Sequence, residues 1–214
     1  MLKVCEIFTS LQGESTHAGR RCMFIRLAHC NLQCSYCDTL YANINPEYKE
    51  YTVDQLVNLV LDSKEKLVEI TGGEPLLHEE TPLLCQKLID NNIEVLLETN
   101  GSVSIENVPK EVCRILDCKL PGSGMDCKNN FANYNFLTPN DEVKFVISSR
   151  QDFDYAIDVI NKYKLFNKTS KLLASPVWGR VEFQDLAQWV VDSKLPLRMQ
   201  LQMHKIIWGD KKGV

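Results

Sequence analysis

Three cysteines lie close together in the sequence, at Cys30, Cys34 and Cys37. A closed structural zinc site takes four ligands, and a cubane iron–sulfur cluster usually takes four thiolates. Three neighbouring thiols without an evident fourth therefore predict a cluster in which one iron is left open to bind a small molecule. A zinc knuckle, or three unrelated buried thiols, is the alternative interpretation of these residues alone.

The composition indicates a globular chain in a reducing compartment. The 214 residues are 44% hydrophobic with a formal net charge of −4, which argues against nucleic acid as a partner. No apolar run approaches the ~18 residues of a membrane span, and residues 1–6 do not resemble a signal peptide. Nine cysteines predict free or metal-bound thiols in the cytoplasm. We expect a single domain over residues 1–214, without a membrane partner.

Short apolar runs alternate with amphipathic segments along the chain. The pattern predicts strands over residues 23–27, 66–71, 94–98, 113–119, 142–147, 171–174 and 197–201, and helices over residues 53–61, 81–90, 152–162 and 183–192. This alternation predicts an α/β fold with a partial, open parallel (β/α) barrel of about six strands and few, short helices. In such sheets the site lies at the carboxyl ends of the strands.

Polar residues and glycines follow several of these predicted strands directly. They are the cysteine group, Thr71-Gly72-Gly73-Glu74-Pro75, Glu98-Thr99-Asn100-Gly101, Asp117-Cys118-Lys119 and Ser175-Pro176-Val177. Because the carboxyl ends of parallel strands share one rim, we expect all five groups to meet there. Alone, the glycines are also typical of a strand-to-helix turn, and the acids and the lysine are typical of a solvated surface.

The C-x3-C-x2-C spacing together with Gly72-Gly73-Glu74-Pro75 resembles the radical S-adenosylmethionine (SAM) superfamily. The resemblance implies a 4Fe–4S cluster on the three cysteines, whose open iron chelates SAM, and a barrel of the radical SAM type. One electron from the cluster then releases a 5′-deoxyadenosyl radical. The implied cofactor-binding residues are Tyr36, Cys37, Asp38, Gly73, Glu74, Glu98, Asp117, Cys118, Lys119, Ser175, Pro176 and Val177.

A more specific resemblance covers nearly the whole chain. Leu11-Gln12-Gly13-Glu14, Cys37-Asp38-Thr39 and the tail from Gln200 to Lys205 are similar to the 7-carboxy-7-deazaguanine synthase family. That family implies a lyase reaction in queuosine and 7-deazapurine biosynthesis. It converts 6-carboxy-5,6,7,8-tetrahydropterin to 7-carboxy-7-deazaguanine with loss of ammonia and regenerates SAM.

The family also implies roles for individual residues. Thr39 resembles the residue that holds a magnesium ion, although a helix N-cap is its plain alternative. Gly13 permits close approach, and Arg26 offers a planar fork for a carboxylate, where a surface turn and a structural ion pair are the alternatives. The implied substrate contacts are Leu11, Gln12, Gly13, Glu14, Arg26, Thr71, His204 and Val214.

Two features depart from the family or escape interpretation. Ser15 stands where the family often has glycine, and residues 123–136 are weakly patterned.

By analogy, the electron donor is a flavodoxin or ferredoxin and the assembly is a homodimer. Two alternatives stay open at this level. One is a different radical SAM enzyme, such as a glycyl-radical activase acting on a protein, and the other is a metal-binding scaffold that cleaves no SAM.

Overall fold

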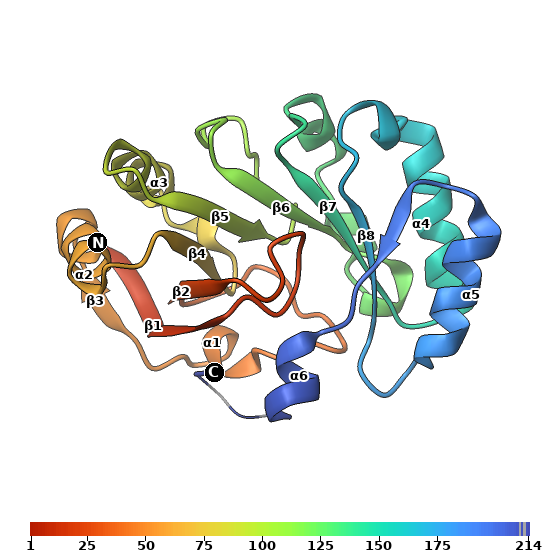
Figure 1. Cartoon of the computed structure of the whole chain (residues 1–214), viewed down its shortest axis with the longest axis horizontal. Helices are drawn as coiled ribbons and strands as arrows, with labels where there is room; N and C mark the ends of the chain where they lie inside the picture. The colour runs from red at the N-terminus through yellow and green to blue at the C-terminus, as the bar shows by residue number, and fades with distance from the viewer. Residues whose placement is uncertain (210, 212) are drawn as a thin grey trace.

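One sheet runs through the part of the chain that the computed structural model describes, residues 1–209, 211, 213 and 214. Its strand order is β3-β1-β2-β4-β5-β6-β7-β8-β9 (Figure 1). The strands are β1 (Leu2–Leu11), β2 (Arg21–Leu27), β3 (Lys49–Tyr51), β4 (Leu67–Gly72), β5 (Glu94–Thr99), β6 (Cys113–Cys118), β7 (Glu142–Ile147), β8 (Leu172–Pro176) and β9 (Leu197–Met199).

The parallel part of the sheet confirms the predicted α/β fold. β2 and the strands from β4 to β9 pair in parallel, seven strands in the described residues where about six were predicted. The sheet does not close, because β3 and β9 form its two edges, so the architecture is a partial open barrel. The sequence patterns did not predict β1 and β3. β1 pairs in antiparallel fashion with both β2 and β3.

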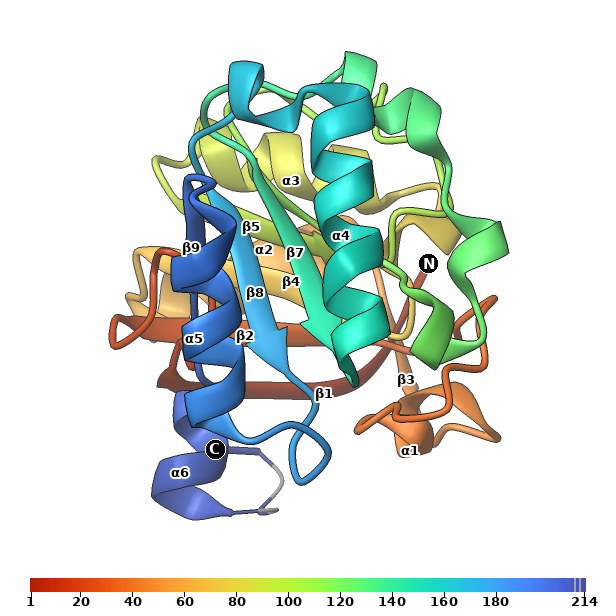
Figure 2. The same cartoon turned by 90° about the vertical axis from the view of Figure 1, so that its right-hand side faces the viewer.

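Helices cover the outer face of the sheet. Figure 2 shows α4 and α5 lying in front of β7 and β8. The helices are α1 (Leu40–Asn43), α2 (Val53–Ser63), α3 (Thr81–Asp90), α4 (Arg150–Tyr163), α5 (Phe183–Ser193) and α6 (Met203–Trp208). None of those built from described residues has the length and apolarity needed to cross a membrane.

Local capping explains where two of these helices begin. Before α2, Thr52 Oγ1 accepts from the Gln55 amide at 3.2 Å while the Gln55 side chain accepts from the Thr52 amide at 2.8 Å. This reciprocal capping box satisfies two amides that a helix start leaves unpaired. Ser149 caps α4 by accepting from the Asp152 amide at 3.2 Å, so the helix starts two residues before the predicted position. The predicted bounds of α3 and β7 are confirmed.

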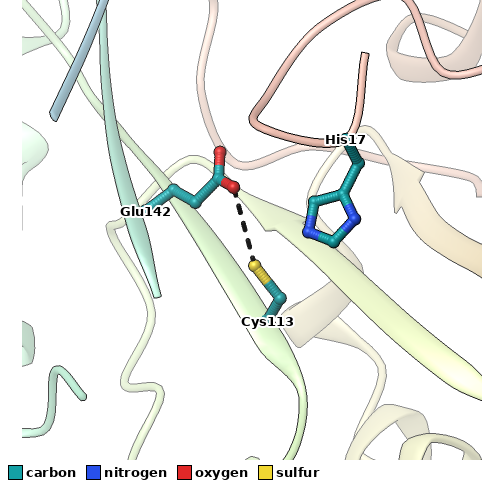
Figure 3. A group of neighbouring side chains, drawn as sticks. All are labelled: His17, Cys113 and Glu142. Carbon is teal, nitrogen blue, oxygen red and sulfur yellow. Dashed lines mark hydrogen bonds between the residues drawn. The ribbon is translucent and has the colours of Figure 1, made fainter. Parts of the chain in front are cut away.

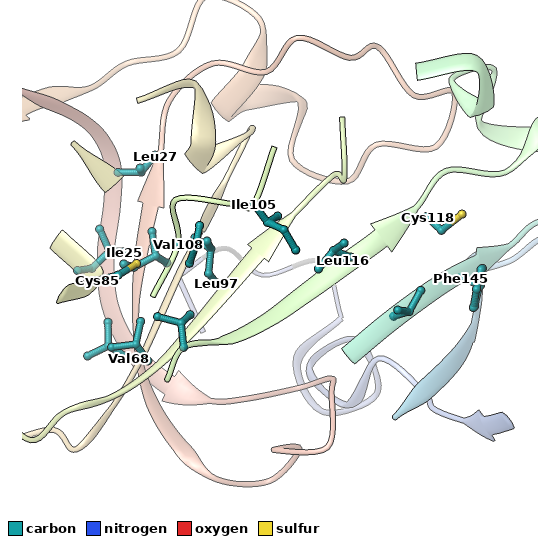
Figure 4. Close-up of a cluster of buried hydrophobic side chains, with 14 of the residues drawn as sticks. Ile25, Leu27, Val68, Cys85, Leu97, Ile105, Val108, Leu116, Cys118 and Phe145 are labelled. Carbon is teal, nitrogen blue, oxygen red and sulfur yellow. The ribbon is translucent and has the colours of Figure 1, made fainter. Parts of the chain in front are cut away.

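The two faces of the parallel strands differ in chemistry. Outward side chains such as Ile25, Val68, Leu97 and Phe145 belong to one apolar cluster between sheet and helices (Figure 4). Side chains alternate between faces along a strand, so their neighbours point into the barrel. Inward positions of β4, β5, β6 and β7 carry the polar side chains Glu69, Thr71, Glu98, Asp117 and Lys144, which line the interior cavity, while the inward Leu67, Leu96 and Ile115 belong to a small apolar cluster.

A buried ion pair joins the beginning of β6 to the loop before β7. Arg114 and Asp141 are 1% and 0% exposed, and the guanidinium Nη2 donates to Asp141 Oδ2 at 2.5 Å. Arg114 Nε and its backbone amide donate to Asp141 Oδ1 at 2.8 and 3.0 Å. Thr138 donates to the other oxygen through its amide at 2.6 Å. The carboxylate is thus saturated with donors, as a buried charge requires.

Replacing Arg114 tests the energetic weight of this pair. Arg114→Met leaves the Asp141 charge buried with neutral donors only, so we expect the free energy of unfolding to fall by about 3–5 kcal/mol. Urea denaturation of the reduced protein measures the change. Lys87→Met removes the exposed ion pair with Asp54 and serves as the control, with an expected loss of at most about 1 kcal/mol. Equal losses in the two variants would contradict the assignment.

Candidate active site

The carboxyl ends of the parallel strands surround a cavity of about 490 Å³. It is lined by every site residue that the sequence predicted except Glu74, Cys118 and Pro176. The three thiols lie on its wall together with residues from the two ends of the chain, including Leu11 and Val214. The fold therefore brings together the two groups of residues that the sequence patterns assigned to cofactor and to substrate.

The loop that carries the thiols is fixed by backbone contacts along its length. At its start, the His29 amide donates to Ala42 O at 2.8 Å. Farther along, the Ser35 amide donates to Ser123 O at 3.1 Å, and the Tyr36 hydroxyl donates to Val146 O at 3.2 Å. The segment that begins at Ser123, which carried no readable sequence pattern, thus helps to position the cysteines.

One asparagine side-chain amide lies beside each of two of the three sulfur atoms. Asn100 Nδ2 lies 3.5 Å from Cys30 Sγ, and Asn43 Nδ2 lies 3.2 Å from Cys37 Sγ. Burial raises the pKa of the Cys30 and Cys34 thiols. Ligation of a cation would offset that cost, because a coordinated thiol is deprotonated. The site therefore combines thiols that favour metal ligation with donors suited to anionic sulfur.

Two glycines allow the end of β4 to lie directly against the cysteine loop. A Cβ at Gly72 would overlap the Leu27 carbonyl oxygen, and one at Gly73 would overlap that of His29. Gly72 also has a φ of +141°, which favours glycine. The Gly73 amide donates to Leu27 O at 3.0 Å. The glycines thus form the turn after β4 and also allow a backbone-to-backbone approach that the sequence did not predict.

Three predicted cofactor residues have side chains outside the cavity. Glu74 is fully buried and accepts from the Asn100 amide at 2.6 Å and from Thr99 Oγ1 at 2.8 Å, so its carboxylate joins the ends of β4 and β5. Cys118 occupies an outward position of β6 and packs in the apolar cluster. Pro176 is buried at the end of β8, although both of its chain neighbours line the cavity.

A buried lysine lies at the centre of the charged wall. Lys144 Nζ is 3.1 Å from Glu14 Oε2 and also forms an ion pair with Glu98. Burial alone would raise the pKa of Glu98, but Lys144 beside it lowers that pKa to about 2. Burial likewise opposes the charge of Lys144, yet Glu14 and Glu98 hold its pKa well above the usual range. Glu98 and Lys144 are therefore charged at neutral pH.

Side-chain hydrogen bonds attach the loop after β1 to β4 and to the tail of the chain. Gln12 Nε2 donates to the Glu69 carboxylate, and Gln12 Oε1 accepts from the Glu14 amide at 2.7 Å. Gln202 Nε2 donates to Glu14 Oε1 at 2.9 Å. Burial and the nearby charge of Glu98 raise the pKa of Glu69 well above its usual range, which favours its neutral acid. The Glu14 carboxylate is consequently fixed at both oxygens.

Arg26 combines the two roles that the sequence left open. Its Nε donates to Glu6 Oε2 at 2.9 Å, and the Tyr41 hydroxyl donates to the same oxygen at 2.9 Å. The side chain also lines the cavity. The ion pair with Glu6 therefore orients the guanidinium at the cavity wall, where a planar fork can bind a carboxylate.

Thr39 and Asp38 lie beside the last cysteine. Thr39 occupies the N-cap position of α1, but its side chain makes no capping hydrogen bond. Its Oγ1 is 3.7 Å from Cys37 Sγ and lines the cavity. Asp38 forms an ion pair with Lys205 at 3.5 Å. The site thus offers one hydroxyl and one half-exposed carboxylate as oxygen ligands for a cation.

Two buried oxygen atoms on the cavity wall have no hydrogen-bond partner among the described residues. They are Asn43 Oδ1 and Asp117 Oδ1. The other carboxylate oxygen, Asp117 Oδ2, accepts from Lys119 Nζ at 2.7 Å, and both residues line the cavity. Buried polar atoms are normally paired, and these two acceptors therefore indicate a ligand that brings donors.

The tail of the chain packs against the loop after β1. The Met203 amide donates to Gly13 O at 2.9 Å, and a Cβ at Gly13 would overlap the His204 side chain. Ser15 has a φ of 63°, the conformation for which glycine is the usual choice. Its amide donates to Gln200 Oε1 at 2.8 Å. The position that departs from the family thus keeps the backbone conformation that glycine favours.

Several residues of the site escaped the sequence analysis. Lys144 and Glu69 are the most important, because they organise the charged wall, and Asn43 supplies a donor to Cys37; Asn100 was expected at the rim, but its contact with Cys30 was not predicted. A usable signal did exist for the first two. Glu69 is the single charged residue of β4, and Lys144 follows Glu142 on the same face of β7, so both are charged residues at inward strand positions, where burial without a partner is costly.

Gly73→Ala tests the contact between β4 and the cysteine loop. The added methyl group overlaps the His29 carbonyl, so we expect displacement of the loop and several-fold less iron bound per chain after anaerobic reconstitution. Iron analysis measures this. Gly19→Ala is the control, because its methyl group meets open space and only backbone strain of about 1 kcal/mol applies. Full iron loading of Gly73→Ala would contradict the role given to this contact.

Comparisons with known proteins identify the family. The family model of the Radical SAM superfamily matches residues 25–190. A 7-carboxy-7-deazaguanine synthase of Koribacter versatilis is 39% identical over all of both chains, and one of Chlorobaculum tepidum is 41% identical over all of this chain and 97% of its own. The crystal structure of QueE from Escherichia coli shares the fold with a TM-score of 0.78, at 19% identity over 95% of this chain and 94% of that one. The chain belongs to the 7-carboxy-7-deazaguanine synthase family of the radical SAM superfamily.

Proposed function

We propose that this chain converts 6-carboxy-5,6,7,8-tetrahydropterin to 7-carboxy-7-deazaguanine with release of ammonia, as a carbon–nitrogen lyase of queuosine and 7-deazapurine biosynthesis. One observation carries the proposal. The three clustered thiols and the Leu11-Gln12-Gly13-Glu14 segment line the same cavity. A cofactor held by the thiols and a flat substrate held by that segment would thus lie within one cavity.

The residues present fit the cofactors that the superfamily implies. Cys30, Cys34 and Cys37 would hold the 4Fe–4S cluster, and the Asn43 and Asn100 side-chain amides lie against the sulfur atoms. When bound, the cluster supplies one electron that cleaves SAM and starts radical chemistry on the substrate. The donors of SAM, its ammonium and ribose hydroxyls, match the unpaired buried oxygens of Asn43 and Asp117. The protein's own part is to orient the reacting groups and to exclude water.

The charged wall suits a pterin. The Glu14 carboxylate, fixed by Lys144 and Gln202, would accept hydrogen bonds from the guanidine-like edge of the ring. Arg26 and His204 lie on the same cavity and would contact the substrate carboxylate or carbonyl. Thr71, 3.4 Å from Glu98, would contact the ring from β4. The remaining proposed contact is Val214.

A magnesium ion fits beside Thr39. Mg²⁺ prefers oxygen ligands and retains several waters, so one hydroxyl and the substrate carboxylate form a suitable set. The absence of a capping bond leaves Thr39 Oγ1 free of that role. The ion would neutralise the substrate carboxylate and thereby favour the later elimination of ammonia.

We infer the cellular setting from the thiols and the family. All nine cysteines are free, which suits a reducing cytoplasm. The electron donor would be a flavodoxin- or ferredoxin-type protein. A homodimer would protect the open edges of the sheet, which expose unpaired backbone groups.

Turnover by the reconstituted protein tests the proposal directly. Under anaerobic conditions with dithionite, SAM, Mg²⁺ and 6-carboxytetrahydropterin, we expect 7-carboxy-7-deazaguanine in excess of the SAM consumed, measured by mass spectrometry. Excess product follows because SAM is regenerated in each cycle. Deoxyadenosine without this product, in protein with a verified cluster, would refute the proposed substrate. Cys34→Ala is the control, because without three thiols it should form no product.

The pH dependence of Lys144→Met tests the charged wall. In the wild type, Lys144 keeps the pKa of Glu98 at about 2, so Glu98 stays ionised throughout the working range. Without the cation, burial raises that pKa, so Glu98 gains a proton as the pH falls. We expect kcat/KM of the variant to decrease by about tenfold per pH unit below the new pKa.

Two results separate this role from simple damage to the fold. The wild type should show no such acid limb between about pH 5.5 and 7.5, because Glu98 titrates far below that range. Lys144→Arg keeps the positive charge and should restore a flat profile even if its activity is lower. An unchanged profile in Lys144→Met would show that Lys144 does not control the ionisation of Glu98.

A further inference from the structure

A second group of metal-binding side chains lies at the opposite end of the parallel strands from the thiol loop. It consists of His17 in the loop after β1, Cys113 at the start of β6 and Glu142 at the start of β7 (Figure 3). One ligand atom from each lies within 4.8 Å of the others, and Cys113 Sγ is 3.9 Å from Glu142 Oε1. These distances bring imidazole, thiol and carboxylate ligands to one point.

The buried carboxylate at this point lacks a direct cationic partner among the described residues, and Lys171 is the nearby cation that acts on His17 and Cys113. Glu142 is fully buried, and its carboxylate accepts only from neutral groups of Thr16 and from the Cys113 thiol in the part of the chain described. No Lys, Arg or His nitrogen of the described residues lies within 4.0 Å of it. Cys113 packs with Leu96 and Ile115 in an apolar cluster. A buried carboxylate in such surroundings is costly without a neighbouring positive charge.

The histidine can act as a ligand. A neutral imidazole nitrogen is a common metal ligand, and the His17 ring lies beside Cys113 and Glu142. Its Nδ1 lies 3.5 Å from Glu94 Oε1 and 2.7 Å from Arg20 Nη1, while Figure 3 shows the other ring nitrogen turned toward Cys113 and Glu142. Ligation by that nitrogen requires the tautomer that carries its proton on Nδ1. Arg20 Nη1, which can only donate, lies 2.7 Å from Nδ1, so that tautomer requires the guanidinium to turn away and leave the Nδ1 proton to Glu94 Oε1, 3.5 Å away.

We propose that His17, Cys113 and Glu142 bind a divalent cation of the Zn²⁺ type. Zn²⁺ takes sulfur at about 2.3 Å and nitrogen or oxygen at about 2.0 Å, so tetrahedral sulfur and oxygen ligands lie about 3.5 Å apart. The separation of 3.9 Å between Cys113 and Glu142 needs only a small adjustment. Mg²⁺ and Ca²⁺ are disfavoured because they avoid thiolate and imidazole ligands. Water can complete the shell beside the partly exposed His17, and binding releases the Cys113 proton to solvent.

The site would fasten the loop between β1 and β2 to the sheet. That loop, residues 12–20, also carries Gln12, Gly13 and Glu14 on the cavity wall. Cys113 and Glu142 begin two adjacent strands, so a cation shared with His17 joins the loop to both of them. The proposed ion is thus a structural one, on the far side of the loop from the active-site cavity.

Metal content of the cluster-loaded protein is the first test. After incubation with Zn²⁺ and gel filtration, we expect one equivalent of zinc per wild-type chain and none in Cys113→Ser, by elemental analysis. Cys127→Ser removes an exposed thiol and is the matched control, which should retain the zinc. Retention of zinc by Cys113→Ser would identify an adventitious ion only and overturn the proposal. So would the absence of zinc from the wild type.

Cobalt spectroscopy identifies the ligands, and circular dichroism detects any variant that is misfolded. In full-length protein with Cys30, Cys34 and Cys37 replaced by alanine, Co²⁺ should produce thiolate-to-cobalt absorption that Zn²⁺ displaces. His17→Gln, in a partly exposed loop position, should weaken Co²⁺ binding at least tenfold while circular dichroism stays unchanged. Equal affinity in His17→Gln would overturn the assignment of that ligand and with it the site. Neither measurement uses SAM or the pterin, so the proposed function is tested separately.

Discussion

The direct contact between the end of β4 and the cysteine loop determines where the site can form. At Gly72 and Gly73 the two backbones are so close that no side chain fits between them, and the Glu74 amide donates to His29 O at 2.8 Å. The Glu74 carboxylate then accepts from the Asn100 amide, which fixes β5 to the same point. Three successive strand ends are thereby held together. The thiols and the Asn100 side chain keep their relative positions because these backbone contacts leave little freedom.

The charged wall obeys a second constraint, which is the cost of burying ions. Lys144 is buried between Glu14 and Glu98, which stabilise its charge, and Lys144 in turn stabilises the ionised form of Glu98. Their arrangement depends on strand alternation, which turns one face of the sheet to an apolar core and the other to polar groups. A rigid polar wall of this kind is preorganised for a charged ligand, because little reorganisation is required on binding.

The sequence predicted the parallel strands well because each is an apolar run bounded by turn residues. It predicted α3 and β7 with their observed ends, and it predicted which strand ends would carry polar groups. It did not predict β1, whose half-exposed residues lack strict alternation and which forms through pairing with β2. Lys144 was missed for a related reason. Its partners Glu14 and Glu98 lie 130 and 46 residues away, so local patterns contain no sign of them.

The burial of each cysteine determines how readily its thiol is oxidised. Burial raises the pKa of Cys85 and Cys118 to about 12, and these thiols belong to the apolar core, away from oxidants. The thiols of the cysteine loop lie on an open cavity instead. Because oxidation requires thiolate character and access, air should attack the loop long before the core. Oxygen damage to this protein would therefore be local and chemical, and an inactivated molecule would still be folded and repairable by reduction and a new supply of iron and sulfide.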